Sequence, residues 1–296
     1  MQTTVATHSG PFHADDVLAI ALLRVFLDEN LRVVRSRRPE DWKRADIVLD
    51  VGGVFAPDQR RFDHHQVAYT GALSSAGMVL DWLEREQKVT PHLASHLRSR
   101  LVDYVDEVDN GRVAPDPALP CFSSLVAACS QGAGHVDDHD AAFLRVATFS
   151  AQVVRGLTQA FQDARAARSI VERAMEDAVN HQRAVIYLGH YCRWKPAYFE
   201  LGGANHPTDY VVFPSDSTWR LYCIPVAEDS FQNKRDLPAS WGGRTDEELS
   251  RIIGVEGAMF CHKNLFLSVF DNREALVEAL ESWGLMRRPP SVPADE

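Results

Sequence analysis

The sequence predicts a two-domain α/β protein, in which a parallel-sheet N-terminal domain with helices on both faces leads through a helical connector into a smaller mixed α/β domain. Three observations predict this fold class. Short apolar runs alternate with amphipathic helical patterns at the start of the chain. One long helical pattern follows, and beyond it strand patterns return and end on a single helix. The 296 residues also exceed one average domain.

The first domain, expected over residues 1–135, begins with a strand at residues 3–7. A helix follows from Asp15, because apolar residues from Val17 to Phe26 recur with a 3.6-residue period. The later elements are expected to be strands at 31–35 and 45–51 and helices at 73–87 and 91–108. In parallel sheets functional groups gather at the carboxyl ends of strands. His8 and Asp50 both stand at such ends.

The second half begins with a loop over residues 110–120, which carries three prolines. A helical connector is expected over 136–182, since its pattern runs without a break from about residue 138. The remaining domain, 183–296, is expected to contain strands at 184–188, 210–213, 219–226 and 257–262, a closing helix at 273–283, and a loose proline-rich tail from Arg287.

Composition excludes several classes of protein. No apolar run approaches the roughly 20 residues of a membrane span, and five scattered cysteines without a CxxC pair are typical of the reducing cytoplasm. We therefore expect a cytoplasmic protein without a membrane partner; a homodimer stays open. The net charge of −10 disfavours nonspecific binding of duplex DNA. It is compatible with short or single strands, where a groove and bound cations supply local positive potential.

Four features of the first domain carry side chains that bind metals. They are His8 with His13, Asp15 and Asp16; Asp50; the run Asp63, His64 and His65; and the acidic run Asp103, Asp106 and Asp109. Histidine with carboxylate suits Mn²⁺, Fe²⁺, Co²⁺ or Zn²⁺, whereas oxygen ligands alone favour Mg²⁺ or Ca²⁺. Two such ions about 3.5–4 Å apart need a bridging carboxylate and act on phosphate esters.

Each feature has a simpler interpretation when taken alone. A strand-end aspartate such as Asp50 is commonly a turn or cap residue, and a His-His pair can be surface residues. The three aspartates of the acidic run share one helix face, which is commonly just solvated. All four features fall in the same domain, at strand ends or on one helix face. Their joint occurrence favours a metal centre.

These motifs also carry a resemblance. The segments THSGPFHADDVLA (7–19), VLDVGGVFAPDQRRFDHHQ (48–66) and VDEVDNG (105–111) resemble the Myg-type (melanocyte proliferating gene) exonuclease family of the DHH phosphoesterase superfamily. The likeness extends into the second half through Trp194-Lys195, Ser230-Phe231-Gln232, Leu237-Pro238 with Trp241, and Phe260-Cys261-His262. It implies a DHH domain as the N-terminal, metal-binding part of the chain.

The resemblance implies a role for each candidate residue. His8, His13 and Asp15 would bind one metal, and Asp50 would bridge two. His64 or His65 would complete the second site together with Asp109 or, as second choice, Asp106. Asp63 would hold a histidine in place, and His65 would alternatively contact the scissile phosphate. Asp50, His64 and His65 are thus the expected catalytic residues.

The second domain is expected to supply cations and donors for phosphate, from Lys234, Arg235, His262 and Lys263. Each is equally well explained as ordinary surface charge. The sequence departs from the family at one point. Relatives carry a Gly-Gly pair shortly after the equivalent of His262, where this chain has Phe266-Leu267-Ser268-Val269. Substrate choice is therefore open.

The function that follows is metal-dependent hydrolysis of phosphodiester bonds, as a 3′–5′ exonuclease on RNA or short oligonucleotides. The centre is expected to hold two divalent ions, Mn²⁺ first, with Mg²⁺, Co²⁺, Fe²⁺ or Zn²⁺ as alternatives. One rival is a small-molecule phosphoesterase, such as a pyrophosphatase or a dinucleotide phosphodiesterase. Another is a relative that binds nucleotides or RNA without catalysis, although a buried charge cluster without metals would be costly.

Overall fold

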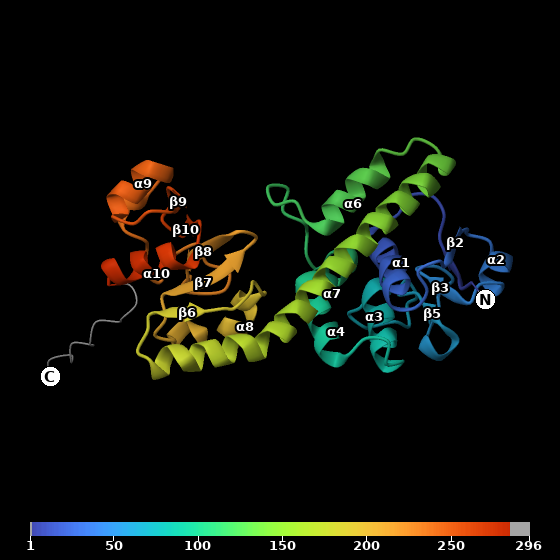
Figure 1. Cartoon of the computed structure of the whole chain (residues 1–296). Coiled ribbons are helices and arrows are strands. Elements are labelled where there is room, and N and C mark those ends of the chain that lie inside the picture. The colour runs from blue at the N-terminus through green and yellow to red at the C-terminus, as the bar shows by residue number, and fades with distance from the viewer. Residues whose placement is uncertain (1, 285–296) are drawn as a thin grey trace. The chain divides into compact units, whose positions relative to one another are not determined.

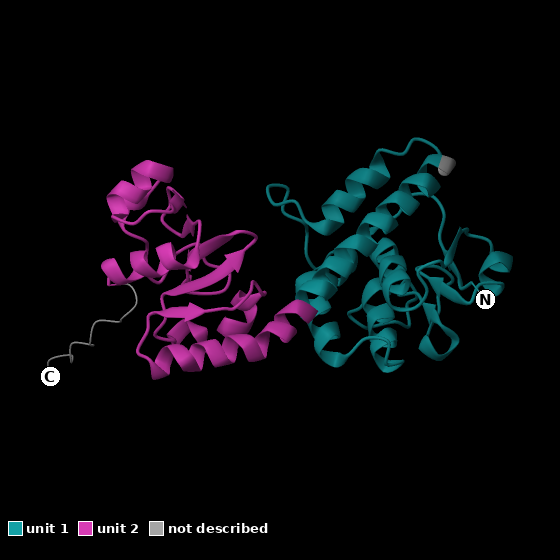
Figure 2. Cartoon of the chain, in the orientation of Figure 1, with its two compact units in different colours: residues 1–161 teal, residues 162–296 magenta. Residues whose placement is uncertain are grey.

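The computed structural model describes residues 2–284, apart from the side chains of residues 136 and 137. The chain divides into two compact units, residues 1–161 and 162–296 (Figure 2). The boundary falls within helix α7 (Val136–Asn180), so the segment expected to be a connector is shared between the two units. The proline-rich tail expected from Arg287 lies outside the described residues.

Unit 1 contains a five-stranded sheet in the order β2-β1-β3-β5-β4. Figure 1 labels β2, β3 and β5 of this sheet. Its strands are β1 (Thr4–Thr7), β2 (Arg32–Arg35), β3 (Ile47–Leu49), β4 (Phe55–Ala56) and β5 (Arg61–Phe62). All neighbours pair in parallel except β4 and β5, which are antiparallel. The predicted strands at the start of the chain are confirmed. The short strands β4 and β5, which flank a 3-10 turn at Pro57–Gln59, were not predicted.

Helices cover both faces of this sheet, as residue alternation along β1 demands. Val5 joins the main core beneath α1 (Ala14–Phe26) and α3 (Ser75–Arg85), whereas Ala6 points to the other face. There it packs with Trp42 of the short helix α2 (Pro39–Lys43). Helix α1 is buried from Ala14 to Leu23, because it lies between the sheet and neighbouring helices. The α/β class is thus confirmed.

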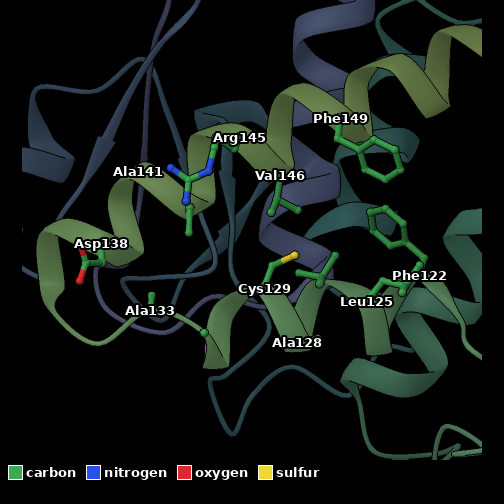
Figure 3. Close-up of a pocket in the computed structure, with 13 residues that line it drawn as sticks. Phe122, Leu125, Ala128, Cys129, Ala133, Asp138, Ala141, Arg145, Val146 and Phe149 are labelled. Carbon is green, nitrogen blue, oxygen red and sulfur yellow. The ribbon is translucent and has the colours of Figure 1, made fainter.

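The expected helix over 91–108 is confirmed as one unbroken helical stretch, made of α4 (Pro91–Leu97), a π-helical turn at Arg98–Val102 and α5 (Asp103–Asp109). Helix α6 (Phe122–Gln131) was not predicted. It packs beside the start of α7, and Phe122, Leu125 and Phe149 line a largely apolar cavity of about 570 Å³ between the two helices (Figure 3).

Unit 2 is built on a second five-stranded sheet, ordered β6-β7-β8-β10-β9. Its strands are β6 (Val185–Tyr187), β7 (Tyr210–Ser215), β8 (Thr218–Cys223), β9 (Ala258–Cys261) and β10 (Leu267–Phe270). Only β6 and β7 pair in parallel; the other neighbours are antiparallel. The smaller mixed sheet is therefore confirmed, and β10 is the strand that was not predicted.

Both faces of this sheet are covered. On one face, α9 (Asp246–Ile253), α10 (Arg273–Ser282) and Trp241 of the 3-10 turn Ala239–Trp241 form one core. On the other face, the second part of α7 packs with α8 (Trp194–Glu200), followed by a 3-10 turn at Gly203–Asn205. No helix within residues 2–284 is both long and apolar enough to cross a membrane.

Candidate metal centre

The strand register of unit 1 brings three separated sequence motifs together. Ala6 of β1 pairs with Val48 of β3, and Leu49 of β3 pairs with Phe62 of β5. Counting forward in parallel register therefore aligns His8 with Asp50 and Asp50 with Asp63. The carboxyl ends of β1, β3 and β5 thus form one edge, which is where an open parallel sheet places its functional groups.

Asp50 occupies a turn that is uncommon for a residue with a side chain. Its φ is +50°, in the left-handed region that aspartate tolerates better than most residues. Gly52 and Gly53 follow with φ of +98° and +67°, and the Asp50 amide is anchored by donating to the Phe62 carbonyl at 2.9 Å. The turn directs a nearly fully buried carboxylate toward the histidines instead of capping the backbone.

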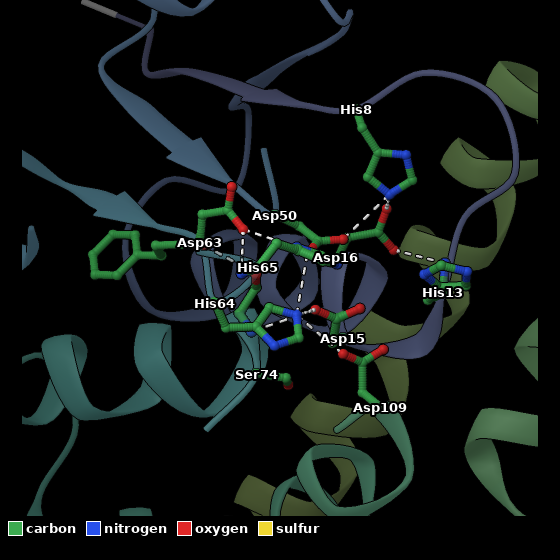
Figure 4. Close-up of polar contacts among 12 residues, drawn as sticks. His8, His13, Asp15, Asp16, Asp50, Asp63, His64, His65, Ser74 and Asp109 are labelled. Atoms are coloured by element: carbon green, nitrogen blue, oxygen red, sulfur yellow. Dashed lines mark hydrogen bonds and ion pairs between the residues drawn. The ribbon is translucent and has the colours of Figure 1, made fainter. Parts of the chain in front are cut away.

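The Asp50 carboxylate lies between histidines from opposite sides of the site (Figure 4). Its Oδ2 is 3.2 Å from Nε2 of His8. Its Oδ1 is 3.4 Å from Nε2 of His64 and 3.3 Å from Nδ1 of His65. Each oxygen therefore faces a different group of imidazoles.

The N-terminus of α1 supplies two further carboxylates, both fully buried. Asp16 accepts a hydrogen bond from the His13 amide at 3.2 Å, and its other oxygen lies 3.2 Å from Nε2 of His8. Asp15 accepts from the Ser75 amide at 3.3 Å and approaches Nε2 of His64 at 3.8 Å. The positive end of the helix dipole favours negative charge at these positions.

His64 is oriented by its neighbours so that Nε2 faces the carboxylates. This nitrogen is 3.1 Å from Oδ2 of Asp109. The other ring nitrogen, Nδ1, is 3.3 Å from Oδ1 of Asn110. The Asn110 amide nitrogen donates to the carbonyls of Ala72 and Asp106, which fixes its oxygen toward His64. A proton on Nδ1 then leaves the Nε2 lone pair free to bind a metal.

His65 lies at the exposed side of the centre, with 60% of its side chain accessible against 7% for His64. Asp63 holds it in place: one carboxylate oxygen is 2.9 Å from Nδ1 of His65 and accepts from the His65 amide at 3.1 Å. The other accepts from the Gly53 amide at 2.5 Å. Asp63 thus has the contacts of a positioning residue.

Among the described residues, three groups of side chains place their ligand atoms within 4.8 Å of one another: His8, His13 and Asp50; Asp50, His64 and His65; and His13, Asp15 and Asp109. Asp50 belongs to two groups, as does His13. These groups contain every residue named as a metal ligand from the sequence except Asp106. A shared carboxylate is what a two-metal centre needs.

Asp106 has a different environment from the other candidates, because one oxygen of its carboxylate is used by the backbone while the other makes no hydrogen bond. One oxygen accepts from the Ser74 amide and hydroxyl at 3.0 and 2.5 Å and from the Gly77 amide at 3.2 Å. These groups form the start of α3, so Asp106 caps that helix. It also lies outside the three donor groups. Asp109, one helical turn further on, belongs to one of these groups and lies beside His64.

The buried charges shift one another's protonation. Burial raises the pKa of Asp15, and the charges of Asp50 and Asp109 add to that effect. Burial likewise raises the pKa of Asp16. Burial alone would lower the pKa of His8, but hydrogen bonds and charge from Asp16 and Asp50 raise it to about 9.

His64 and Asp50 form the centre of this network. Carboxylates of Asp109 and Asp50 raise the pKa of His64 to about 10, although burial opposes this. Burial also opposes ionisation of Asp50, yet hydrogen bonds from His64 and His8 lower its pKa below the ordinary value. The site is therefore built around an excess of buried negative charge, which cations compensate.

Whether these residues fit a metal ion can be tested by asking whether buried polar atoms at the centre lack hydrogen-bond partners. Four buried atoms at the centre make no hydrogen bond of good geometry, although the last three lie 3.1–3.4 Å from an oppositely charged group: Oδ1 of Asp15, Oδ2 of Asp16, Oδ1 of Asp50 and Nε2 of His64. Leaving such atoms unpaired in a protein interior is costly. Imidazole and carboxylate donors in this arrangement fit divalent transition metals. The residues present are consistent with a metal centre.

Comparison with known proteins agrees with this geometry. The family model MYG1_exonuc, described as Uncharacterised protein family (UPF0160), matches residues 4–282. The chain belongs to this family. The MYG1 protein of Chlamydia pneumoniae is 39% identical over 280 residues, covering 94% of this chain and 95% of that protein. The MYG1 exonuclease of Homo sapiens is 30% identical, covering 91% and 82%. The resemblance expected from the motifs is confirmed.

Among solved structures, RecJ of Thermus thermophilus in complex with Mn²⁺ matches with a TM-score of 0.30 and 11% identity. The match covers 97% of this chain and 53% of that one. A second RecJ structure, bound to manganese, matches with a TM-score of 0.27 and 12% identity. Likeness at this level adds no weight to the description of the site.

Three residues of this MYG1_exonuc member had no assigned role from the sequence. Asp16 was one of the candidates in the first motif without a role of its own, although its place in the first turn of α1 was a signal. Asn110 directly follows Asp109. Arg37 extends from the end of β2, where its guanidinium lies 3.3 Å from Nδ1 of His8 and donates to the Ser9 carbonyl at 3.2 Å. The basic run after β2 was the signal for it.

The candidate phosphate-binding residues of unit 2 lie in different environments. Lys234 is corrected: its ammonium donates to the Tyr198 hydroxyl and to the carbonyls of Gly203 and His206 at 2.5–3.0 Å, so it ties a loop together. Arg235 and Lys263 are exposed, and the His262 ring lies against Phe266 with ring centres 4.4 Å apart. The segment without the Gly-Gly pair forms β10, an ordinary strand between β8 and β9.

Proposed function

We propose that this chain is a metal-dependent phosphoesterase that removes nucleotides from the 3′ end of RNA or short oligonucleotides, using two divalent ions, Mn²⁺ first. Membership of the family whose mammalian relatives are named MYG1 exonuclease supports the reaction class. The position of Asp50 supports a centre of two ions, since its two carboxylate oxygens face different histidines at 3.2 and 3.4 Å.

The ligands divide between the two ions. His8, His13 and Asp15 would hold one ion, His64 and Asp109 the other, and Asp50 both. When bound, the ions would supply Lewis acidity toward the phosphate and lower the pKa of water. His65 is exposed beside Asp50 and is held by Asp63, so it can donate a hydrogen bond to a phosphate oxygen. Arg37 adds a positive charge on the His8 side.

The test is a substrate panel with the metal controlled. The purified chain is treated with chelator and reloaded with Mn²⁺ or Mg²⁺, then incubated with RNA labelled at the 3′ or the 5′ end. Progressive shortening of 5′-labelled RNA, with immediate release of a 3′ label, is expected. Faster turnover of pyrophosphate or of dinucleotides than of RNA would favour the small-molecule rival. No product from any substrate with either ion would contradict the enzymatic proposal.

Two variants and matched controls address the site itself. Asp50→Asn keeps a residue that tolerates the left-handed turn, and His64→Ala removes one imidazole. Both are expected to reduce hydrolysis at least 100-fold while circular dichroism stays unchanged. Asp58→Asn and His92→Ala change exposed residues of the same unit and are expected to retain full activity. Tight RNA binding without turnover in the unmodified chain would favour the non-catalytic rival.

A further inference from the structure

Unit 2 contains a cavity of about 730 Å³ whose walls combine aromatic rings with cations. It lies on the face of the sheet that α8 covers only in part. Phe213 of β7 pairs directly with Arg220 of β8, and Tyr222 is two residues further along β8. Residues two apart on a strand point to the same face, so all three side chains reach one wall of the cavity.

The aromatic part of this wall is partly open. Phe213 and Tyr222 stack with ring centres 5.5 Å apart and an angle of 13° between their planes. Tyr191 packs against Phe213 at 5.2 Å, yet 60% of it remains exposed. Phe231 lines the opposite loop and is fully exposed. Exposed rings of this kind offer faces on which a planar group stacks.

The cationic part consists of Lys195 and Arg220. Nε of Arg220 is buried and has no hydrogen-bond partner among the described residues. No aspartate or glutamate belongs to the described residues that line the cavity. The chain as a whole carries a net charge of −10, so a cavity wall with two cations and no acidic residue differs from the rest of the protein. Such a wall favours the binding of an anion.

Two segments that carry the family resemblance meet here. Trp194-Lys195 and Ser230-Phe231 are far apart in sequence, and all four residues line this cavity. Neither segment contributes to the metal centre of unit 1. The two motifs therefore lie together in the wall of one cavity.

We propose that this cavity binds one nucleotide unit of a single-stranded nucleic acid, with its base stacked against Tyr191 and Phe231 and a neighbouring phosphate held by Lys195 and Arg220. The ligand class follows from the chemistry: a planar ring next to a negative charge. This inference rests on the proposed function, because it assigns a substrate contact to unit 2. Because the contact lies outside the metal centre, nucleic-acid binding and hydrolysis can be measured separately.

The experiment measures binding to the full chain in the presence of chelator, by anisotropy of a labelled oligonucleotide. Phe231→Ala is expected to weaken binding about 5- to 150-fold, equivalent to about 1–3 kcal/mol for one stacked base. Phe149→Ala, which also removes an exposed phenylalanine, is the matched control and should bind normally. Lys195→Gln should weaken binding and reduce its salt dependence, while Arg251→Gln should do neither.

Two further ligands identify what is recognised. A sugar–phosphate oligomer of equal length without bases should bind weakly to wild type and be unaffected by Phe231→Ala. A nucleoside monophosphate tests whether the cavity recognises a strand or a free nucleotide. Weaker binding than that of the oligonucleotide indicates a strand, and equal binding indicates a free nucleotide. Equal oligonucleotide affinity of wild type, Phe231→Ala and Lys195→Gln would overturn the proposal.

Hydrolysis of a small ester, methyl p-nitrophenyl phosphate, separates this inference from the function. Wild type loaded with Mn²⁺ should hydrolyse this ester, because the ester is too small to need the cavity of unit 2. If wild type binds the strand through Phe231 but hydrolyses nothing, the proposed function fails and the cavity assignment stands.

Discussion

Nδ1 of His64 lies 3.3 Å from Oδ1 of Asn110, and this contact turns Nε2 of the same ring toward three carboxylates. Asn110 is itself held by two backbone carbonyls, so its oxygen cannot rotate away without losing both bonds. The ring orientation at the centre therefore depends on a residue that binds no metal.

Asn110→Ala is expected to weaken metal affinity about 10- to 100-fold, because His64 loses the partner that fixes its tautomer and orientation. Competition titration with a coloured chelator measures this. Asn205→Ala, at an exposed position of unit 2, should leave affinity unchanged. Wild-type affinity in Asn110→Ala would show that the contact does not orient the ring.

Stability of the chelator-treated protein is expected to fall as pH rises from about 6.5 to 10. The folded pKa values of His8 and His64 are raised to about 9 and about 10, above the unfolded value near 6.5. Their stabilising contribution is complete below pH 6.5 and is lost as pH passes through the folded values. Urea unfolding of wild type and His8→Gln across this range measures the difference. A wild-type advantage that grows with pH would contradict the assignment.

Metal binding is expected to show the opposite pH dependence. Imidazole must lose its proton to bind a metal, so protons compete more strongly as pH falls below about 9. The rise in melting temperature on adding Mn²⁺ should therefore increase from pH 6.5 to 9. A constant rise over that range would exclude His8 and His64 as ligands.

Asp106 and Asp109 are expected to separate stability from metal binding. Asp106→Ala removes the acceptor for the start of α3 and should lower the free energy of unfolding by about 2 kcal/mol, with metal affinity kept. Asp106→Asn keeps one acceptor oxygen and should recover part of the loss. Asp109→Ala should reduce metal affinity with little effect on the metal-free protein. Urea unfolding and metal titration of the three variants test this, and the reverse pattern would restore Asp106 as the ligand.

Gly77→Ala is expected to destabilise the protein by about 1–3 kcal/mol, because its added Cβ would lie 2.2 Å from the buried Oδ2 of Asp106. Gly156→Ala is the matched control in α7, where nothing lies within 4 Å. It should stabilise the helix by about 0.5–1 kcal/mol. Thermal unfolding compares the two; an unchanged Gly77→Ala would mean that Asp106 moves without cost.

Local patterns predicted most of the elements that periodicity can reveal. The run from Val17 to Phe26 and the strand before Asp50 are confirmed, because burial of one face repeats with a fixed period. Short elements such as β5 and α8 were missed. They take their conformation from neighbours more than from their own few residues.

The sequence by itself determined the family, the α/β class and the residue types that suit a metal, since ligand chemistry and hydrophobic period are properties of local composition. Only tertiary structure decided which residues of those types meet. Parallel register aligned His8, Asp50 and Asp63, and helix packing turned Asp106 to a backbone cap while leaving Asp109 beside His64. The physical reason is that direction and distance come from long-range packing, which no short segment encodes alone.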